Sequence, residues 1–171
     1  WHPDWGEAVI GRQAVGLGRG VLFGAVDVFS PFSPLEVDRE WRRGIDAAHV
    51  EYRLAPTASA DVIAAFGESS NASAVLGRCR GYVGSLDAEL IYGRRAEDTM
   101  AGLALSTAVF EAETHVEFAV FDVPDDEVYH RLWGDDHKVG VAVAGASYTF
   151  DVGNGLTLLG EYHYNGFGLE D

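Results

Sequence analysis

Short segments of alternating apolar and polar residues recur along the whole chain and constrain its fold more than any other feature. In one of them, apolar and mostly polar positions interleave as two sets: Ala48, Val50, Tyr52 and Leu54 against Ala47, His49, Glu51 and Arg53. Successive side chains of a strand point to opposite faces, so this pattern indicates a strand with one apolar face. The pattern predicts an all-β fold of about nine strands, near 7–16, 45–54, 59–67, 74–83, 86–95, 100–108, 113–121, 139–150 and 156–165.

The connections between these segments predict antiparallel hairpins. Gly153-Asn154-Gly155 separates the last two segments, and Gly and Asn tolerate the positive φ that tight hairpins require. Short connections alternate with longer or more polar ones: 55–58, 84–85, 109–112 and 151–155 against 17–44, 68–73, 96–99 and 122–138. Short turns at one end and long loops at the other are typical of outer-membrane proteins. We therefore expect an antiparallel up-and-down transmembrane β-barrel.

Alternation alone does not say which face meets water, so two interpretations remain. In a soluble β-barrel that binds a small apolar ligand, Val50, Leu90 and Val116 point inward. In a membrane barrel they point toward lipid, and arginine at Leu90 or Val116 is costly. Aromatic residues near strand ends favour the membrane, because aromatic girdles lie at both interfaces: Tyr52, Tyr92, Tyr148, Phe150, Tyr162 and Tyr164. Strand lengths close to the ~9–11 residues that cross a bilayer agree with it.

Charge and cysteine content exclude several classes of protein. The chain has 12 Lys and Arg against 27 Asp and Glu, a formal net charge of -15, so a nucleic-acid partner is not expected. The single Cys79 cannot form an internal disulfide, and no Cys/His spacing fits a structural zinc site. No segment approaches the ~20 apolar residues of a transmembrane helix.

In the membrane interpretation, the polar strand positions line a water-filled lumen. The predicted pore-lining residues are Arg12, His49, Glu51, Arg53, Arg78, Arg80, Glu89, Glu113, His115, Glu117, Glu161 and His163. Their acidic surplus predicts a mild preference for cations, opposed by Arg12, Arg78 and Arg80, which could form a track for anionic solutes. We expect arginine to be tolerated far better at Glu89 or Glu117 than at the lipid-facing positions.

The longest connection, 17–44, predicts a short helix. Ser33 can cap a helix that begins at Pro34, and Arg42 and Arg43 can close its last turn before Gly44. Folded into the lumen, this loop would form a constriction or plug; on the outside, its charges would pair with one another. The charges concerned are Asp38, Arg39, Glu40, Arg42 and Arg43.

Signals for catalysis or metal binding are weak. The motif Gly-x-Ser-x-Gly is absent and no serine stands beside an evident base, so we do not expect an enzyme. His115 with Glu117, and Glu161 with His163, could hold a metal, but wetted lumen residues are the favoured interpretation, and no metal or cofactor is predicted. An acidic loop with Asp125-Asp126-Glu127 and Asp135-Asp136 could bridge divalent cations to lipopolysaccharide, although a solvated loop is favoured.

The chain also resembles a known family. The stretch GRQAVGLGRGVLFGAVDVFSPFSPLEVDREWRRGIDA (11–47), followed by hairpins ending in GASYTFDVGNGLTLLGEYHYNG, is similar to porin-like outer-membrane β-barrel proteins of Gram-negative bacteria, and more loosely to alginate-export-type barrels. The resemblance implies a channel or solute-export porin for small polar or charged solutes, in contact with outer-membrane lipid and lipopolysaccharide. Such proteins end in a strand with a terminal aromatic residue, and this chain ends Phe167-Gly168-Leu169-Glu170-Asp171. We therefore expect residues 1–171 to be a single but incomplete barrel domain.

Overall fold

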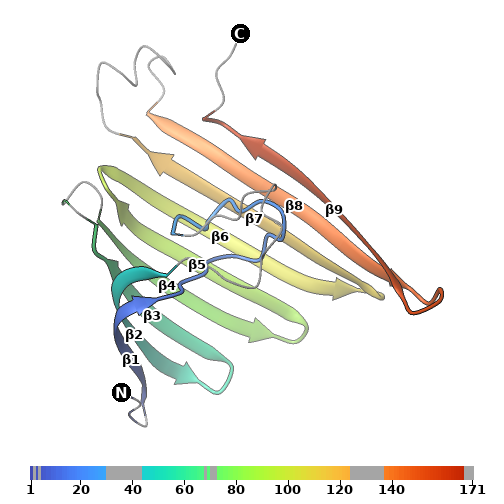
Figure 1. The fold of residues 1–171 in the computed structure, drawn as a ribbon, viewed down its shortest axis with the longest axis horizontal. Helices are drawn as coiled ribbons and strands as arrows, with labels where there is room; N and C mark the ends of the chain where they lie inside the picture. The colour runs from blue at the N-terminus through green and yellow to red at the C-terminus, as the bar shows by residue number, and fades with distance from the viewer. Residues whose placement is uncertain are drawn as a thin grey trace.

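A computed structural model describes residues 1, 3, 5–29, 44–67, 69, 73–123 and 137–167. Within them the chain forms nine antiparallel strands that pair in sequence order as one meander sheet (Figure 1). The strands are β1 (Gly6–Gln13), β2 (Ile45–Ala55), β3 (Ala58–Ala65), β4 (Ala74–Val83), β5 (Leu86–Arg95), β6 (Asp98–Val109), β7 (Ala112–Asp122), β8 (Lys138–Phe150) and β9 (Leu156–Asn165). The predicted all-β antiparallel fold is confirmed; the main difference is that β1 ends at Gln13.

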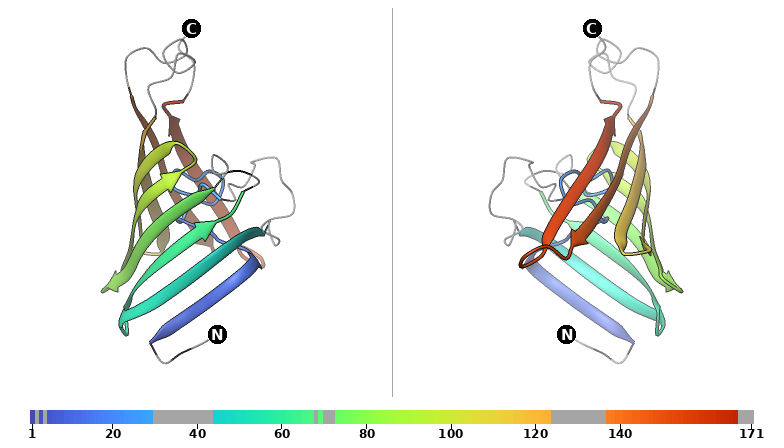
Figure 2. Two further views of the ribbon diagram at one scale, coloured as in Figure 1. Left: turned by 90° about the vertical axis from the view of Figure 1, so that its left-hand side faces the viewer. Right: turned by 90° about the vertical axis from the view of Figure 1, so that its right-hand side faces the viewer.

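The nine described strands form an open sheet and not a closed barrel. β1 pairs only with β2, and β9 only with β8, so the sheet has two free edges in the described part of the chain. The sheet is strongly curved, as Figure 2 shows, but the curvature does not bring the two edges into hydrogen-bonding contact. The structure therefore shows the antiparallel meander of the predicted up-and-down barrel without its closure, and alternation within strands carries no information about whether the outermost strands meet.

The predicted turns are present at one end of the sheet. Gly153 and Gly155 adopt φ of 64° and 97° in the β8–β9 hairpin, and Gly84 adopts 65° between β4 and β5. These left-handed values are the ones that glycine supplies without strain. We call the end with the connections at 56–57, 84–85, 110–111 and 151–155 the turn end, and the opposite end the loop end.

The outer, convex face of the sheet is apolar and exposed. Leu90 and Val116 are 59% and 51% exposed, whereas their strand neighbours Glu89 and Glu117 on the other face are 1% and 0% exposed. Other exposed apolar side chains share the outer face: Val50, Tyr52, Leu54, Val62, Tyr92, Phe118, Phe150, Leu156, Leu158, Tyr162 and Tyr164. The facing required for a soluble barrel with an apolar interior is therefore not the observed one.

The inner, concave face is divided into two halves along the strands. Toward the loop end it is apolar and forms the buried core, with Ile63, Leu76, Ile91, Met100, Phe121 and Val139 among its members. Toward the turn end it carries buried or half-buried polar side chains: Asp61, Arg78, Glu89, His115, Glu117 and Glu161. The inner face thus has an apolar half and a charged half.

Residues 14–29, which we call the strap, cover part of this inner face. The strap leaves β1 at the loop end and crosses the concave side of the sheet, as the blue trace in Figures 1 and 2 shows. Val15, Leu17, Ala25 and Val26 of the strap are buried within the core. The described part of the chain contains no helix, and so none that could span a bilayer. The helix predicted at 34–43 and the predicted constriction charges at 38–40 and 42–43 lie outside the described residues.

Candidate functional site

The strap is held against the sheet by carboxylates that accept its backbone N–H groups. Glu117 Oε1 accepts from Arg19 and from Gly20 at 2.6 Å, and its Oε2 accepts from Ala25 at 2.7 Å and Val26 at 3.4 Å. Glu117 is fully buried, and each of its two carboxylate oxygens accepts two backbone hydrogen bonds. A buried carboxylate is stable only when it is paired or fully hydrogen-bonded, and here backbone dipoles meet that need.

Glu161 and Glu89 complete this arrangement, which we call the clasp: Glu89, Glu117 and Glu161 with the strap N–H groups they bind. Glu161 accepts from three successive N–H groups, those of Val21, Leu22 and Phe23, at 2.6, 2.8 and 2.9 Å. Glu89 Oε1 accepts from Gly18 at 3.1 Å. Since these carboxylates come from β5, β7 and β9, the clasp ties the strap across much of the curved sheet.

Two glycines let the strap backbone approach the carboxylates. Gly18 has φ of 77°, and a Cβ there would lie 2.3 Å from Glu117 Oε1. A Cβ at Gly20 would lie 1.8 Å from the carbonyl oxygen of Phe23. A side chain at either position would clash, so glycine at 18 and 20 is required for the strap backbone to reach these carboxylates.

A chain of ion pairs continues from the clasp across the inner face. Arg19 of the strap binds Asp87 at 2.7 Å and Glu89 at 3.2 Å. Arg78 donates through Nε to Asp61 Oδ1 at 3.0 Å and through a terminal nitrogen to the carbonyl of Gly16 at 3.1 Å. These contacts pair the buried Arg78 and the half-buried Arg19 with carboxylates, and such pairing is the condition for burying a charge.

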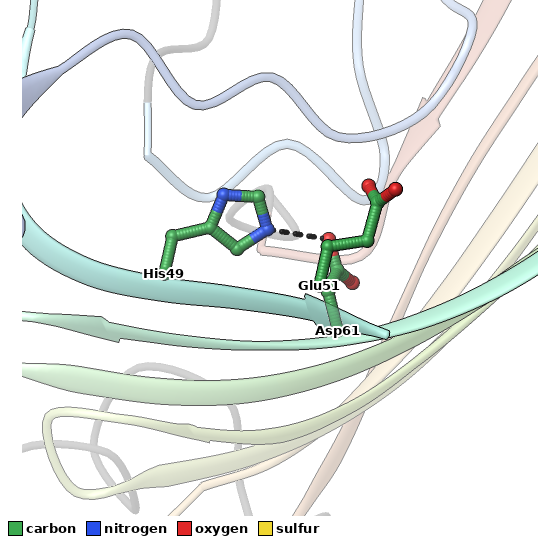
Figure 3. A group of neighbouring side chains, drawn as sticks. All are labelled: His49, Glu51 and Asp61. Atoms are coloured by element: carbon green, nitrogen blue, oxygen red, sulfur yellow. Dashed lines mark hydrogen bonds and ion pairs between the residues drawn. The ribbon is translucent and has the colours of Figure 1, made fainter. Parts of the chain in front are cut away.

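One group of side chains has metal-ligand spacing. Ligand atoms of His49, Glu51 and Asp61 lie within 4.8 Å of one another, and among the described residues no other such group occurs. Figure 3 shows His49 Nε2 pointing at Asp61, at 2.7 Å. Arg78 also binds Asp61, and Arg80 binds Glu51. Two guanidinium groups already neutralise these carboxylates, so the arrangement is an ion-pair cluster rather than a cation site.

The two pairs considered for metal binding are likewise engaged. The oxygens of Glu117 and Glu161 are used by the strap, and His115 Nε2 lies 2.8 Å from Glu161 Oε1. His163 stacks on Phe23 of the strap, with ring centroids 4.8 Å apart. Neither pair presents a free set of lone pairs.

The predicted pore-lining residues fall into three groups. The strap and its ion pairs bury Arg78, Glu89, His115, Glu117 and Glu161. His49, Glu51, Arg53, Arg80, Glu113 and His163 remain at least partly accessible. Arg12 is exposed and pairs in register with Asp46, on the face shared by Ile10 and Ala48, so strand alternation places it on the outer face.

Burial reverses one expectation about substitutions. Arginine at Glu117 or Glu89 would remove acceptors from buried N–H groups and add a cation beneath the strap. Each buried donor left without a partner costs about 1–3 kcal/mol. Tolerance at these positions is therefore no longer expected, although both side chains do point away from the outer face as predicted.

Three charged side chains of these ion pairs were not identified from the sequence, nor were the contacts between the strap and the sheet. Arg19, Asp61 and Asp87 join the buried ion pairs but were not among the predicted site residues. Asp61 and Asp87 occupy inward positions of their strands, so the alternation that selected Glu89 could have selected them. The dense glycines at 16–20 were the available signal for close backbone contact.

A hollow of about 310 Å³ lies at the turn end of the inner face, away from the strap. Strands β2, β3 and β4 and the β2–β3 turn form it, and its polar lining includes Glu51, Arg53, Thr57, Ser59, Arg80 and Tyr82. Arg80 donates to Ser59 Oγ at 3.0 Å and also binds Glu51. Two of the accessible cations of the inner face, Arg53 and Arg80, therefore lie in this hollow.

Comparison with protein-family models, with curated proteins and with solved structures finds no match for this chain.

Proposed function

We propose that this chain forms wall and plug of an outer-membrane β-barrel that acts as a channel or solute-export porin for small polar or charged solutes. The observation that carries the proposal is the facing of the sheet: apolar side chains lie on the outer face while charged ones lie on the inner face. The alternation is seen at neighbouring positions: Leu90 is exposed on the outer face while Glu89 is buried on the inner face, and Val116 and Glu117 differ in the same way. In water, an apolar face of this size is unfavourable, whereas lipid is its natural solvent.

The distribution of aromatic side chains on the outer face supports the proposal. Tyr52, Tyr148 and Phe150 lie near the turn end, and Trp5 stacks on Tyr52 with ring centroids 5.9 Å apart. Toward the loop end the outer face carries Tyr92, Tyr162 and Tyr164. Between them lie aliphatic residues: Val50, Val62, Leu90 and Val116. Two aromatic bands around an aliphatic one is the order that a bilayer and its interfaces favour.

The strap gives the proposed channel its constriction. It occupies the concave side, where a lumen would lie, and enters from the loop end. By analogy with other barrels, the short turns would face the periplasm and the long loops the exterior. On this assignment the strap narrows the passage from the outside, and the charged half of the inner face opens toward the periplasm.

Membrane fractionation tests the proposal directly. Expressed in a Gram-negative cell with a secretion signal, the chain or a longer protein that contains it should sediment with the outer membrane and need detergent for extraction. A compact, folded monomer that stays in solution without detergent would contradict the membrane assignment, because it would require the apolar outer face to be covered by water alone.

A further inference from the structure

Two guanidinium groups of the inner face, those of Arg53 and Arg80, line the hollow at the turn end. The strap seals Glu89 and Glu117, which are 1% and 0% exposed, and the side chain of Glu161 is sealed as well. A solute in the interior therefore does not meet these three carboxylates. It meets the side chains that the strap leaves uncovered.

The hollow contains two guanidinium groups and one carboxylate. Arg80 is held in place by Glu51 and Ser59. Arg53 is exposed, and no carboxylate among the described residues binds it. Glu7 of β1 pairs in register with Glu51, so it is the other carboxylate on this part of the inner face. Arg53 is therefore a guanidinium with all of its donors available, beside a second one fixed in orientation.

The hydroxyl groups of the hollow add further donors. Ser59 Oγ accepts from Arg80 and keeps its own hydrogen, and Tyr82 brings a phenol to the rim. Guanidinium groups bind carboxylate and phosphate in a bidentate manner, and neighbouring hydroxyls complete such sites. From this geometry we infer that the hollow binds the anionic group of a small solute, a carboxylate or a phosphate, with Arg53 and Arg80 as its ligands.

A small anionic solute would thus be the one that the proposed channel carries. Binding in the hollow does not depend on the proposed function, whereas passage of the solute through a channel does. The inferred site also replaces the anionic track expected from Arg12, Arg78 and Arg80. Arg12 lies on the outer face, Arg78 is committed to Asp61, and Arg80 alone of the three borders the hollow. Arg53 takes the place of the other two.

A cysteine reporter can test the hollow without any measurement of conductance. Thr57 lines the hollow and is exposed, so Thr57→Cys in a Cys79→Ser background places one thiol there. The folded full chain is treated with an anionic and a cationic methanethiosulfonate reagent, and each rate is divided by its rate with a free thiol. We expect the anionic reagent to be favoured several-fold, and inorganic phosphate at matched ionic strength to slow it.

The matched variants decide the outcome. Arg53→Gln, which breaks no ion pair of the described residues, should bring the ratio of the two rates close to that of a free thiol; adding Arg80→Gln should abolish protection by phosphate. Asn154→Cys in the same Cys79→Ser background places a thiol in the exposed β8–β9 turn, serves as the control and should show no response to Arg53→Gln. Equal ratios at the two thiols, or no effect of Arg53→Gln, would overturn the inference and leave the proposed channel untouched. Absence of channel activity in a lipid bilayer, in contrast, would overturn the proposed channel and leave the inferred anion site untouched.

Discussion

Glu117 Oε1 on β7 accepts the backbone N–H of Gly20 at 2.6 Å, although the two residues are 97 positions apart in the chain. The contact joins the seventh strand of the sheet to a strap that precedes all strands but the first. The clasp can therefore form only after β7 is in place, and it reports on the folded inner face.

Glu117→Gln should release the strap. The amide keeps one acceptor oxygen, but its NH₂ then faces two of the strap N–H groups, donor against donor. Each N–H left without an acceptor costs about 1–3 kcal/mol of folding free energy. Trypsin cleavage after Arg19 should become faster, and denaturant unfolding in detergent should shift to lower concentration. Glu113→Gln, an exposed inner-face position on the same strand, is the control and should change neither.

Gly20→Ala should have a similar effect through sterics alone. The new Cβ would lie 1.8 Å from the carbonyl oxygen of Phe23, so the strap backbone must move. Overpacking of this kind costs roughly 1–3 kcal/mol. Gly160→Ala on β9 is the matched control, because a Cβ there meets nothing within 4 Å. If both variants resist trypsin like the parent chain, the strap is not seated as described.

Arginine on the outer face tests contact with lipid. Leu90→Arg and Val116→Arg should each cost roughly 2–4 kcal/mol if these positions lie near the bilayer midplane. Glu113→Arg points to the accessible inner face and should cost far less. The measurement is folding into lipid vesicles, followed by urea titration. Similar losses at all three sites would contradict the assignment of the outer face to lipid.

Ion selectivity should follow the accessible charges rather than the total of -15. The cation preference expected from the sequence relied on carboxylates such as Glu89 and Glu117, which the clasp shields. In a conducting form of the protein, Arg53→Glu together with Arg80→Glu should therefore shift the reversal potential in a salt gradient toward cations. Arg12→Gln on the outer face should leave it unchanged. A large shift with Arg12→Gln alone would place the selecting charge elsewhere.

The nine described strands alone should not give a closed monomeric pore. The free edges of β1 and β9 leave backbone N–H and C=O groups unpaired, at several kcal/mol for each group in lipid. Refolded in detergent, the 171-residue chain should show neither a heat-modifiable band nor discrete single-channel steps. The appearance of both from a monomer would mean that the edges do pair.

The strands were predictable because each is a local pattern, and the strap was not because its contacts are distant. Alternation around Leu90 and Val116 gave both the extent of β5 and β7 and the face of each side chain. The turn at Gly153-Asn154-Gly155 followed from the φ values that glycine tolerates. By contrast, the pairing of Glu117 with Ala25 depends on how a curved sheet receives a loop, and no periodicity encodes it. The glycines at 18 and 20 indicate close approach but do not name the partner.

The odd number of strands has a consequence for any assembly that this sheet could complete. In an antiparallel meander of nine strands, the first and the last point the same way. A seam made directly between β1 and β9 would therefore be parallel, and so would a seam between edges of two copies inserted in the same orientation. A barrel that is antiparallel throughout needs an odd number of further strands between the two edges. The parity of the sheet thus restricts its partners before any side chain is considered.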